Sequence, residues 1–144
     1  MMQKEEVKLV TLKEFSHANV AMVADKFEII VVKATSNYIP MSVFNTIFNF
    51  VLGLASKRRV SKVIFDKRSL TVFHQPSMEW YFINWKMRMK ATGCLIHRKI
   101  LPQDQVFVEC VTLAREKLMA ENPDKVWHEL DIAYSDNLID AIEN

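Results

Sequence analysis

VSKVIFD, residues 60–66, is a short run of β-branched and aromatic residues that ends in a carboxylate. This composition predicts a buried strand. Residues 41–58 before it carry apolar residues at helical spacing behind Pro40, and Ser77–Lys90 after it predict a second helix. A buried strand between two helices indicates parallel crossover connections, so the chain is predicted to be an α/β protein.

The rest of the chain extends this pattern in both directions. An apolar run at Val7–Leu12 precedes Val20–Ala24 and Phe27–Thr35, which predict a hairpin with a tight turn at Asp25–Lys26. Further along we expect a strand within Cys94–Leu101, a helix from Pro102 and Asp104 to Glu121, a strand around Leu130–Tyr134 and a short helix at Asn137–Ile142. The predicted fold is a mixed, mostly parallel sheet of about five strands with about four helices packed on it.

Length and composition limit the classes of protein to which the chain can belong. The 144 residues predict one domain, 1–144, in which residues 1–17 form an N-terminal strand or extension. Only Gly53 and Gly93 occur, which excludes a Gly-rich phosphate-binding loop. The most apolar stretch, residues 41–55, is interrupted by polar side chains, so no membrane span is expected. With no signal-peptide pattern and two cysteines expected to be reduced, we predict a cytoplasmic location.

Charge is unevenly distributed along the chain. Residues 57–99 hold eleven Lys and Arg against two acidic residues, whereas residues 100–144 hold three against ten. The basic groups are Lys57-Arg58-Arg59, Lys67-Arg68, Lys86/Arg88/Lys90 and Arg98-Lys99. Nucleic-acid binding would need exposed aromatic residues among them, and Trp80 is the one candidate, so no nucleic-acid partner is expected. We expect the basic middle to face the acidic C-terminal third within or between subunits.

The predicted helix at Ser77–Lys90 carries more apolar surface than one packing face uses. At 100° per residue, Met78, Phe82, Trp85 and Met89 share one face, and a second apolar group lies nearly opposite. A neighbouring element covers the second group, or it is an exposed patch for a partner or second copy, or it lines a pocket for an apolar ligand. The candidate patch comprises Met78, Trp80, Tyr81, Ile83, Trp85 and Met87.

A second candidate site lies where the strand at residues 60–66 ends. Open α/β sheets bind ligands at the carboxyl ends of their strands. The polar residues expected there are Asp66, Arg68, Ser69, His74 and Ser77. The alternative is that Asp66 caps a backbone turn or pairs with Lys67 or Arg68.

No catalytic or metal motif accompanies these sites. The four histidines, at positions 17, 74, 97 and 128, are dispersed, so no metal is expected. Cys94 and Cys110 are expected to be inert core thiols, and the chain has no Gly-x-Ser-x-Gly nucleophile elbow. The chain is therefore predicted to be no enzyme and to need no cofactor.

Three stretches resemble the anti-sigma-factor-antagonist-like family, also described as STAS-like, SpoIIAA-like or STAS/SEC14-type. They are SKRRVSKVIFDKRSLTVF (56–73), HRKILPQDQVFVECV (97–111) and DIAYSDNLIDAIEN (131–144), and the resemblance spans residues 18–144. It implies a STAS-like fold and a regulatory, protein-binding role. The family's regulatory members are switched by a serine near Gln75–Pro76; neither is serine here, and Ser77 is the nearest hydroxyl.

From these observations we predict a non-catalytic, cytoplasmic protein-interaction or regulatory module. It is expected to form a homodimer through the helix at Ser77–Lys90. The alternative is a carrier that shelters a small apolar or lipid-like molecule against the same Trp- and Met-rich segment.

Overall fold

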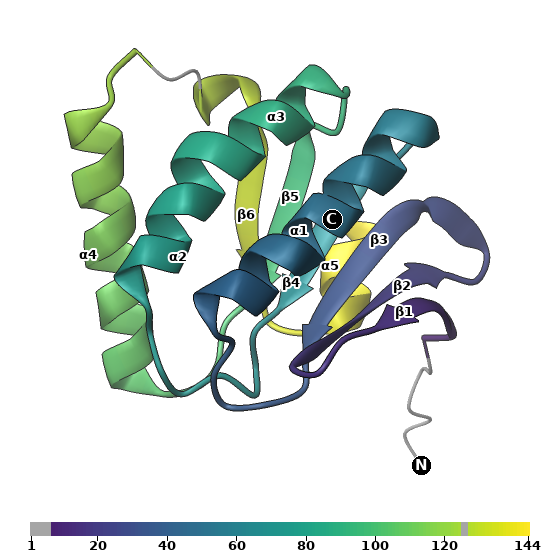
Figure 1. The fold of residues 1–144 in the computed structure, drawn as a ribbon, viewed down its shortest axis with the longest axis horizontal. Helices are drawn as coiled ribbons and strands as arrows, with labels where there is room; N and C mark the ends of the chain where they lie inside the picture. The colour runs from purple at the N-terminus through teal and green to yellow at the C-terminus, as the bar shows by residue number, and fades with distance from the viewer. Residues whose placement is uncertain (1–6, 125–126) are drawn as a thin grey trace.

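Six strands lie in sequence order across one sheet in the computed structural model, which describes residues 7–124 and 127–144 (Figure 1). They are β1 (Leu9–Glu14), β2 (Ala18–Val23), β3 (Lys26–Ala34), β4 (Lys62–Asp66), β5 (Ile96–Ile100) and β6 (Asp131–Ser135). Strands β1 to β3 pair antiparallel, and β3 to β6 pair parallel. The predicted α/β class is confirmed, with six strands rather than about five.

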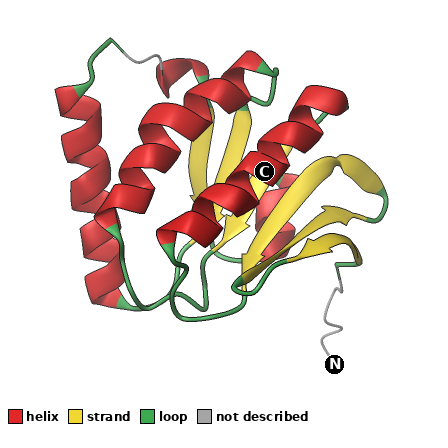
Figure 2. Cartoon of the chain, viewed as in Figure 1, coloured by secondary structure: helices red, strands yellow, loops and turns green. Residues whose placement is uncertain are grey.

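Helices connect the parallel strands and cover the sheet (Figure 2). Their bounds are α1 (Met41–Lys57), α2 (Gln75–Glu79), the π-helix η1 (Trp80–Trp85), α3 (Lys86–Ala91), α4 (Gln105–Glu121), the 3₁₀ turn η2 (Trp127–Glu129) and α5 (Leu138–Glu143). Because α2, η1 and α3 follow without a break, they form one helical unit, here called the α2–α3 unit. With α1, α4 and α5 it makes the four expected helices. In the described part of the chain, no helix has the length and apolar character needed to cross a bilayer.

The sheet divides the interior into two apolar clusters. Strand alternation on β4 sends Val63 and Phe65 into the larger cluster, under α1, the α2–α3 unit and α4. Ile64 points to the opposite face, where it packs with Ile100 and with Ile142 of α5. Figure 1 shows α1 and the α2–α3 unit in front of the sheet, α4 beside the α2–α3 unit, and α5 behind the sheet. Both faces of β4 and β5 are therefore covered, as expected for inner parallel strands.

The α2–α3 unit contains a π-helical turn, which changes which side chains face inward. The backbone N–H of Lys86 donates to the carbonyl of Tyr81, five residues earlier. The two predicted apolar faces assumed α-helical spacing throughout. With the wider turn, Lys86 is fully buried, although α-helical spacing places it in a polar gap. The added residue in the turn thus brings a lysine side chain into the core.

Element boundaries differ from prediction by one to three residues at most ends. The hairpin turn lies at Ala24–Asp25 rather than Asp25–Lys26, because Val23 pairs with Lys26. The N-terminal segment forms β1 where we expected a strand or extension, and residues 1–6 of that segment lie outside the described residues. Helices α4 and α5 begin after Asp104 and Asn137, whose side chains accept backbone N–H groups of the first turn.

Candidate functional site

A cavity lies between the start of α1, the loop after β4, and helices α2 and α4. Its volume is about 50 Å³. A single water molecule needs about 10–15 Å³, so this cavity has room for a molecule of a few heavy atoms. It is lined by Tyr38, Ile39, Phe44, Phe65, Lys67, Leu70, Val72, Phe73, His74, Ser77, Met78, Tyr81 and Phe107. Most of this wall is apolar or aromatic, as in sites for small organic molecules.

The cavity brings together members of both predicted sites. His74 and Ser77 come from the predicted polar edge, and Met78 and Tyr81 from the predicted apolar patch. The His74 ring caps α2: its Nδ1 accepts the backbone N–H of Ser77 at 3.3 Å and lies 2.8 Å from the Ser77 hydroxyl. Because Nδ1 acts as an acceptor, the neutral ring carries its proton on Nε2.

The other three polar-edge residues hold the backbone in place instead. Asp66 is buried, and its two carboxylate oxygens accept the Nε and Nη2 groups of Arg68 at 3.0 and 2.8 Å. This pairing raises the pKa of Arg68. The hydroxyl of Ser69 donates to the carbonyls of Ala34 and Ser36. Asp66 thus takes the alternative role of pairing with Arg68, and these three residues do not line the cavity.

The predicted apolar patch lies largely inside the molecule. Met78, Tyr81 and Trp85 are buried, while Trp80, Ile83 and Met87 are half-buried. Helix α1 supplies much of the cover: the indole Nε1 of Trp85 donates to the carbonyl of Phe48 at 2.7 Å. The ring of Trp80 meets that of Phe44 edge to face, with centroids 6.1 Å apart. Covering by a neighbouring helix, one of the three alternatives, therefore accounts for most of this surface.

Three buried lysines surround the ring of Tyr81, a group that sequence reasoning missed. The Nζ atoms of Lys67, Lys86 and Lys99 lie 5.9, 4.7 and 5.2 Å from its centroid. None of the ion pairs found among the described residues includes these lysines. Their neighbours are aromatic faces, such as Phe82 at 4.1 Å from the Nζ of Lys99. These three residues, here called the lysine cluster, have no carboxylate partner in the ion pairs of the described residues.

Burial shifts the ionisation of this cluster toward neutral amines. Desolvation lowers the pKa of Lys67 to about 8. Desolvation also lowers the pKa values of Lys86 and Lys99 well below 10.5, and the neighbouring lysines lower them further. The same burial raises the pKa of the Tyr81 hydroxyl. The Nζ of Lys99 has no hydrogen-bond partner among the described residues.

For Lys99, the pattern that could have revealed its burial is its position on a covered strand. Lys99 lies in β5, whose neighbours β4 and β6 and whose covering helices leave no exposed face. A predicted inner strand therefore marks each of its residues as buried, charged ones included. For Lys86 no such signal exists, because its burial depends on the π-helical turn.

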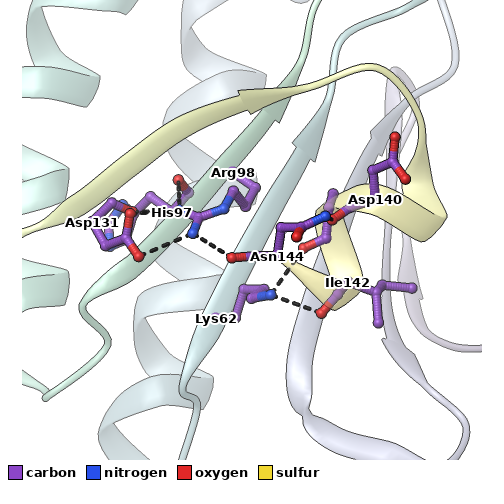
Figure 3. A network of polar contacts seen from close by, with 8 residues as sticks. Lys62, His97, Arg98, Asp131, Asp140, Ile142 and Asn144 are labelled. Atoms are coloured by element: carbon purple, nitrogen blue, oxygen red, sulfur yellow. Dashed lines mark hydrogen bonds and ion pairs between the residues drawn. The ribbon is translucent and has the colours of Figure 1, made fainter.

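A second polar network lies on the opposite face and anchors α5 (Figure 3). The Nζ of Lys62 donates to the carbonyls of Ala141 and Ile142 at 2.9 and 2.7 Å. Arg98 donates to the Asp131 carboxylate and, at 2.6 Å, to the carbonyl of Asn144. The hydrogen bond from Arg98 lowers the pKa of the Asp131 carboxyl group. This network stabilises the position of the last helix.

Ion pairs link the basic middle of the chain with its acidic C-terminal third. Arg98 pairs with Asp131 at 3.0 Å, and Lys90 pairs with Glu129. The expected complementarity between these regions is therefore present within one chain.

The expected burial of the thiols holds for Cys94, whereas Cys110 is half-buried. Burial raises the pKa of the Cys94 thiol to about 12, so it is a poor nucleophile. Cys94 precedes β5, and its carbonyl accepts the Nε2 group of His97 at 3.0 Å. Within residues 7–124 and 127–144, no three His, Cys, Asp or Glu side chains gather to hold a metal ion.

No family model, curated protein or solved structure matches the chain.

Proposed function

We propose that the chain is a non-catalytic, cytoplasmic domain of the STAS-like family that regulates by binding a small, largely apolar molecule. The observation that carries this proposal is the cavity between α1, α2 and α4. It lies beside the carboxyl end of β4, the edge at which open α/β sheets bind ligands. Aromatic rings from three segments, including Phe44, Phe65 and Phe107, give it an apolar wall.

The STAS-like assignment is supported by the order of elements as well as by the three sequence stretches. A hairpin leads into strands that alternate with helices, and a short helix closes the chain. Serine phosphorylation is not part of the proposal. Ser77, the nearest hydroxyl to the family's switch position, is buried and bonded to His74.

The test is whether material bound in cells depends on this cavity. Val72 lines the cavity but is 48% exposed, so Val72→Trp is expected to fill the entrance without disturbing the core. Val106→Trp is the matched control, because Val106 is 70% exposed on α4 and lies outside the cavity. Native mass spectrometry should show a bound small molecule on the wild type and Val106→Trp and its loss from Val72→Trp.

Two results would contradict the proposal. One is the absence of any bound mass together with no thermal stabilisation of the wild type by a library of small organic molecules. The other is equal binding by the wild type and Val72→Trp.

A homodimer through the α2–α3 unit is a second candidate. The half-buried residues Trp80, Ile83 and Met87 favour it, because they leave some apolar surface on that unit. Light scattering after size-exclusion chromatography should then give twice the 16.8 kDa chain mass. Met87→Glu should return the chain mass, whereas Val106→Glu on α4 should leave the dimer intact. A wild-type mass of one chain would overturn this candidate.

A further inference from the structure

We propose that the cavity binds a small monocarboxylate whose carboxylate is held by the Nζ of Lys67. This inference rests on the proposed function and specifies the chemical class of its ligand. It starts from one side chain, which lines the cavity, is 7% exposed and has no carboxylate partner among the described residues.

The position of Lys67 is fixed by the strand that precedes it. Its backbone N–H donates to the carbonyl of Ile100 at 2.8 Å, at the end of β5. The nearest acidic side chain in sequence, Asp66, points to the other face of the sheet and is occupied by Arg68. The Nζ of Lys67 lies 5.0 Å from the centroid of the Phe65 ring. The face of an aromatic ring stabilises an ammonium group only weakly. The buried amine of Lys67 therefore has no counter-charge in the ion pairs of the described residues.

Lys67 is the member of the lysine cluster that can meet an anion in the cavity, because it is among the lining residues. Lys86 and Lys99 approach the Tyr81 ring, which forms part of the cavity wall, but they are not among the residues that line the cavity. Burial disfavours the charged form of all three lysines, and positive neighbours disfavour it further in Lys86 and Lys99. A bound carboxylate reverses this balance, because it pairs with Lys67 where water is largely excluded and the Coulomb attraction is strong.

The wall also limits the kind of anion. Among the described residues, one lysine lines the cavity, together with the polar side chains of Tyr38, His74, Ser77 and Tyr81, and the remaining lining is apolar. A phosphate dianion would meet one cation for its two charges here, whereas a carboxylate would be matched. The volume of about 50 Å³ restricts the enclosed part to a few heavy atoms. A short aliphatic or small aromatic acid satisfies all three conditions: a single charge, an apolar body and a small size.

The experiment compares acids with their neutral amides. Isothermal titration at pH 7 would use butyrate and benzoate against butyramide and benzamide at equal ionic strength. Since a hydrogen bond to a charged group is worth about 1.5–3 kcal/mol, the acids should bind the wild type at least about tenfold more tightly. Lys67→Met should remove this preference while still binding the amides. Lys57→Met, on the exposed end of α1, should keep it.

The outcomes separate this inference from the proposed function. If acids and amides bind the wild type with equal affinity, and Lys67→Met leaves both affinities unchanged, the inference is overturned. The cavity would then be a binding site for neutral molecules. Tight binding of inorganic phosphate without binding of the acids would also overturn it. Failure of every compound, together with absence of a bound mass from cells, would overturn the proposed function itself. If Lys67→Met does not fold, the same titrations are made with Lys67→Gln. A preference for acids that persists in Lys67→Gln would show that Lys67 does not hold the carboxylate.

Discussion

The Nζ of Lys86 lies 3.0 Å from the Nδ1 of His97, and both side chains are almost fully withdrawn from solvent. The second ring nitrogen of His97, Nε2, is 3.0 Å from the carbonyl of Cys94. A carbonyl can only accept, so Nε2 carries the proton and Nδ1 accepts from Lys86. One tautomer of a neutral histidine thus connects the π-helical turn to β5.

The first prediction concerns the ionisation of His97. Burial, followed by the charge of Lys86, lowers its pKa well below 6.5, so it should stay neutral in the folded chain at pH 6. The unfolded chain binds this proton below about pH 6.5, so the free energy of unfolding should fall as the pH falls through that value. Nitrogen-15 NMR of the imidazoles should show His97 as the Nε2-protonated neutral form. Titration of His97 near pH 6.5 would contradict this expectation.

Lys99→Met should stabilise the protein. The Nζ of Lys99 is buried without a hydrogen-bond partner in the described residues, and methionine has nearly the same shape without the amine. Removing an unsatisfied buried polar group should add about 1–3 kcal/mol to the free energy of unfolding, measured in urea at pH 7. Lys57→Met, on an exposed helix end, serves as control and should change it by less than about 0.5 kcal/mol.

The gain from Lys99→Met should depend on pH. Burial holds the pKa of Lys99 in the folded chain below its usual value of 10.5, so the unfolded chain binds more protons between the two values. The wild type should therefore become more stable as the pH rises toward 10.5, and the advantage of the variant should shrink. An advantage that stays constant from pH 7 to pH 10 would contradict a lowered pKa of Lys99 in the folded chain.

Trp85→Phe should destabilise the protein more than Trp80→Phe. The buried indole of Trp85 donates to the Phe48 carbonyl and stacks on Tyr81, with centroids 4.8 Å apart. Its loss removes a buried donor and leaves a space, at a cost of about 2–3 kcal/mol. Trp80 is half-buried, so its replacement should cost less than about 1 kcal/mol. Chemical denaturation of both variants checks the order, and equal losses would show that α1 does not anchor the unit through Trp85.

Arg98→Met should loosen α5. Arg98 is 5% exposed and joins the Asp131 carboxylate and the Asn144 carbonyl to β5. Amide hydrogen exchange at Ala141 and Asn144 should become faster than in the wild type, whereas Arg88→Met, at an exposed position, should not change it. Because the pKa of Asp131 is lowered in the folded chain, the pair stabilises above about pH 3.8 and its contribution is lost as the pH falls further. Unchanged exchange at pH 7 would contradict the anchoring role.

The sequence alone predicted the elements because their patterns are local. The β-branched run at residues 60–66 became β4, and the apolar spacing behind Pro40 became α1. Asp104 and Asn137 marked the start of α4 and α5 through short-range hydrogen bonds to the following turn. The parallel order of the sheet followed from helices placed between strands. These features depend on residues within a few positions of one another.

The candidate site was predicted only in part. His74, Ser77, Met78 and Tyr81 were singled out and do line the cavity, but they were assigned to two separate sites. Asp66 was placed at this sheet edge, and its pairing with Arg68, one of the two expected alternatives, is confirmed. The remaining lining residues come from positions between Tyr38 and Phe107, and their proximity depends on packing, which spacing along the chain does not encode.

Tertiary structure decided the feature with the most chemical consequence, the burial of three lysines. By sequence, Lys67, Lys86 and Lys99 belong to the excess positive charge of residues 57–99, a pattern typical of solvated surfaces. A π-helical turn and a sheet covered on both faces bring them around Tyr81 instead. Composition and periodicity set which elements form, because those depend on local preference. Which charges lose their water depends on how distant elements close over them, and only the folded chain determines that.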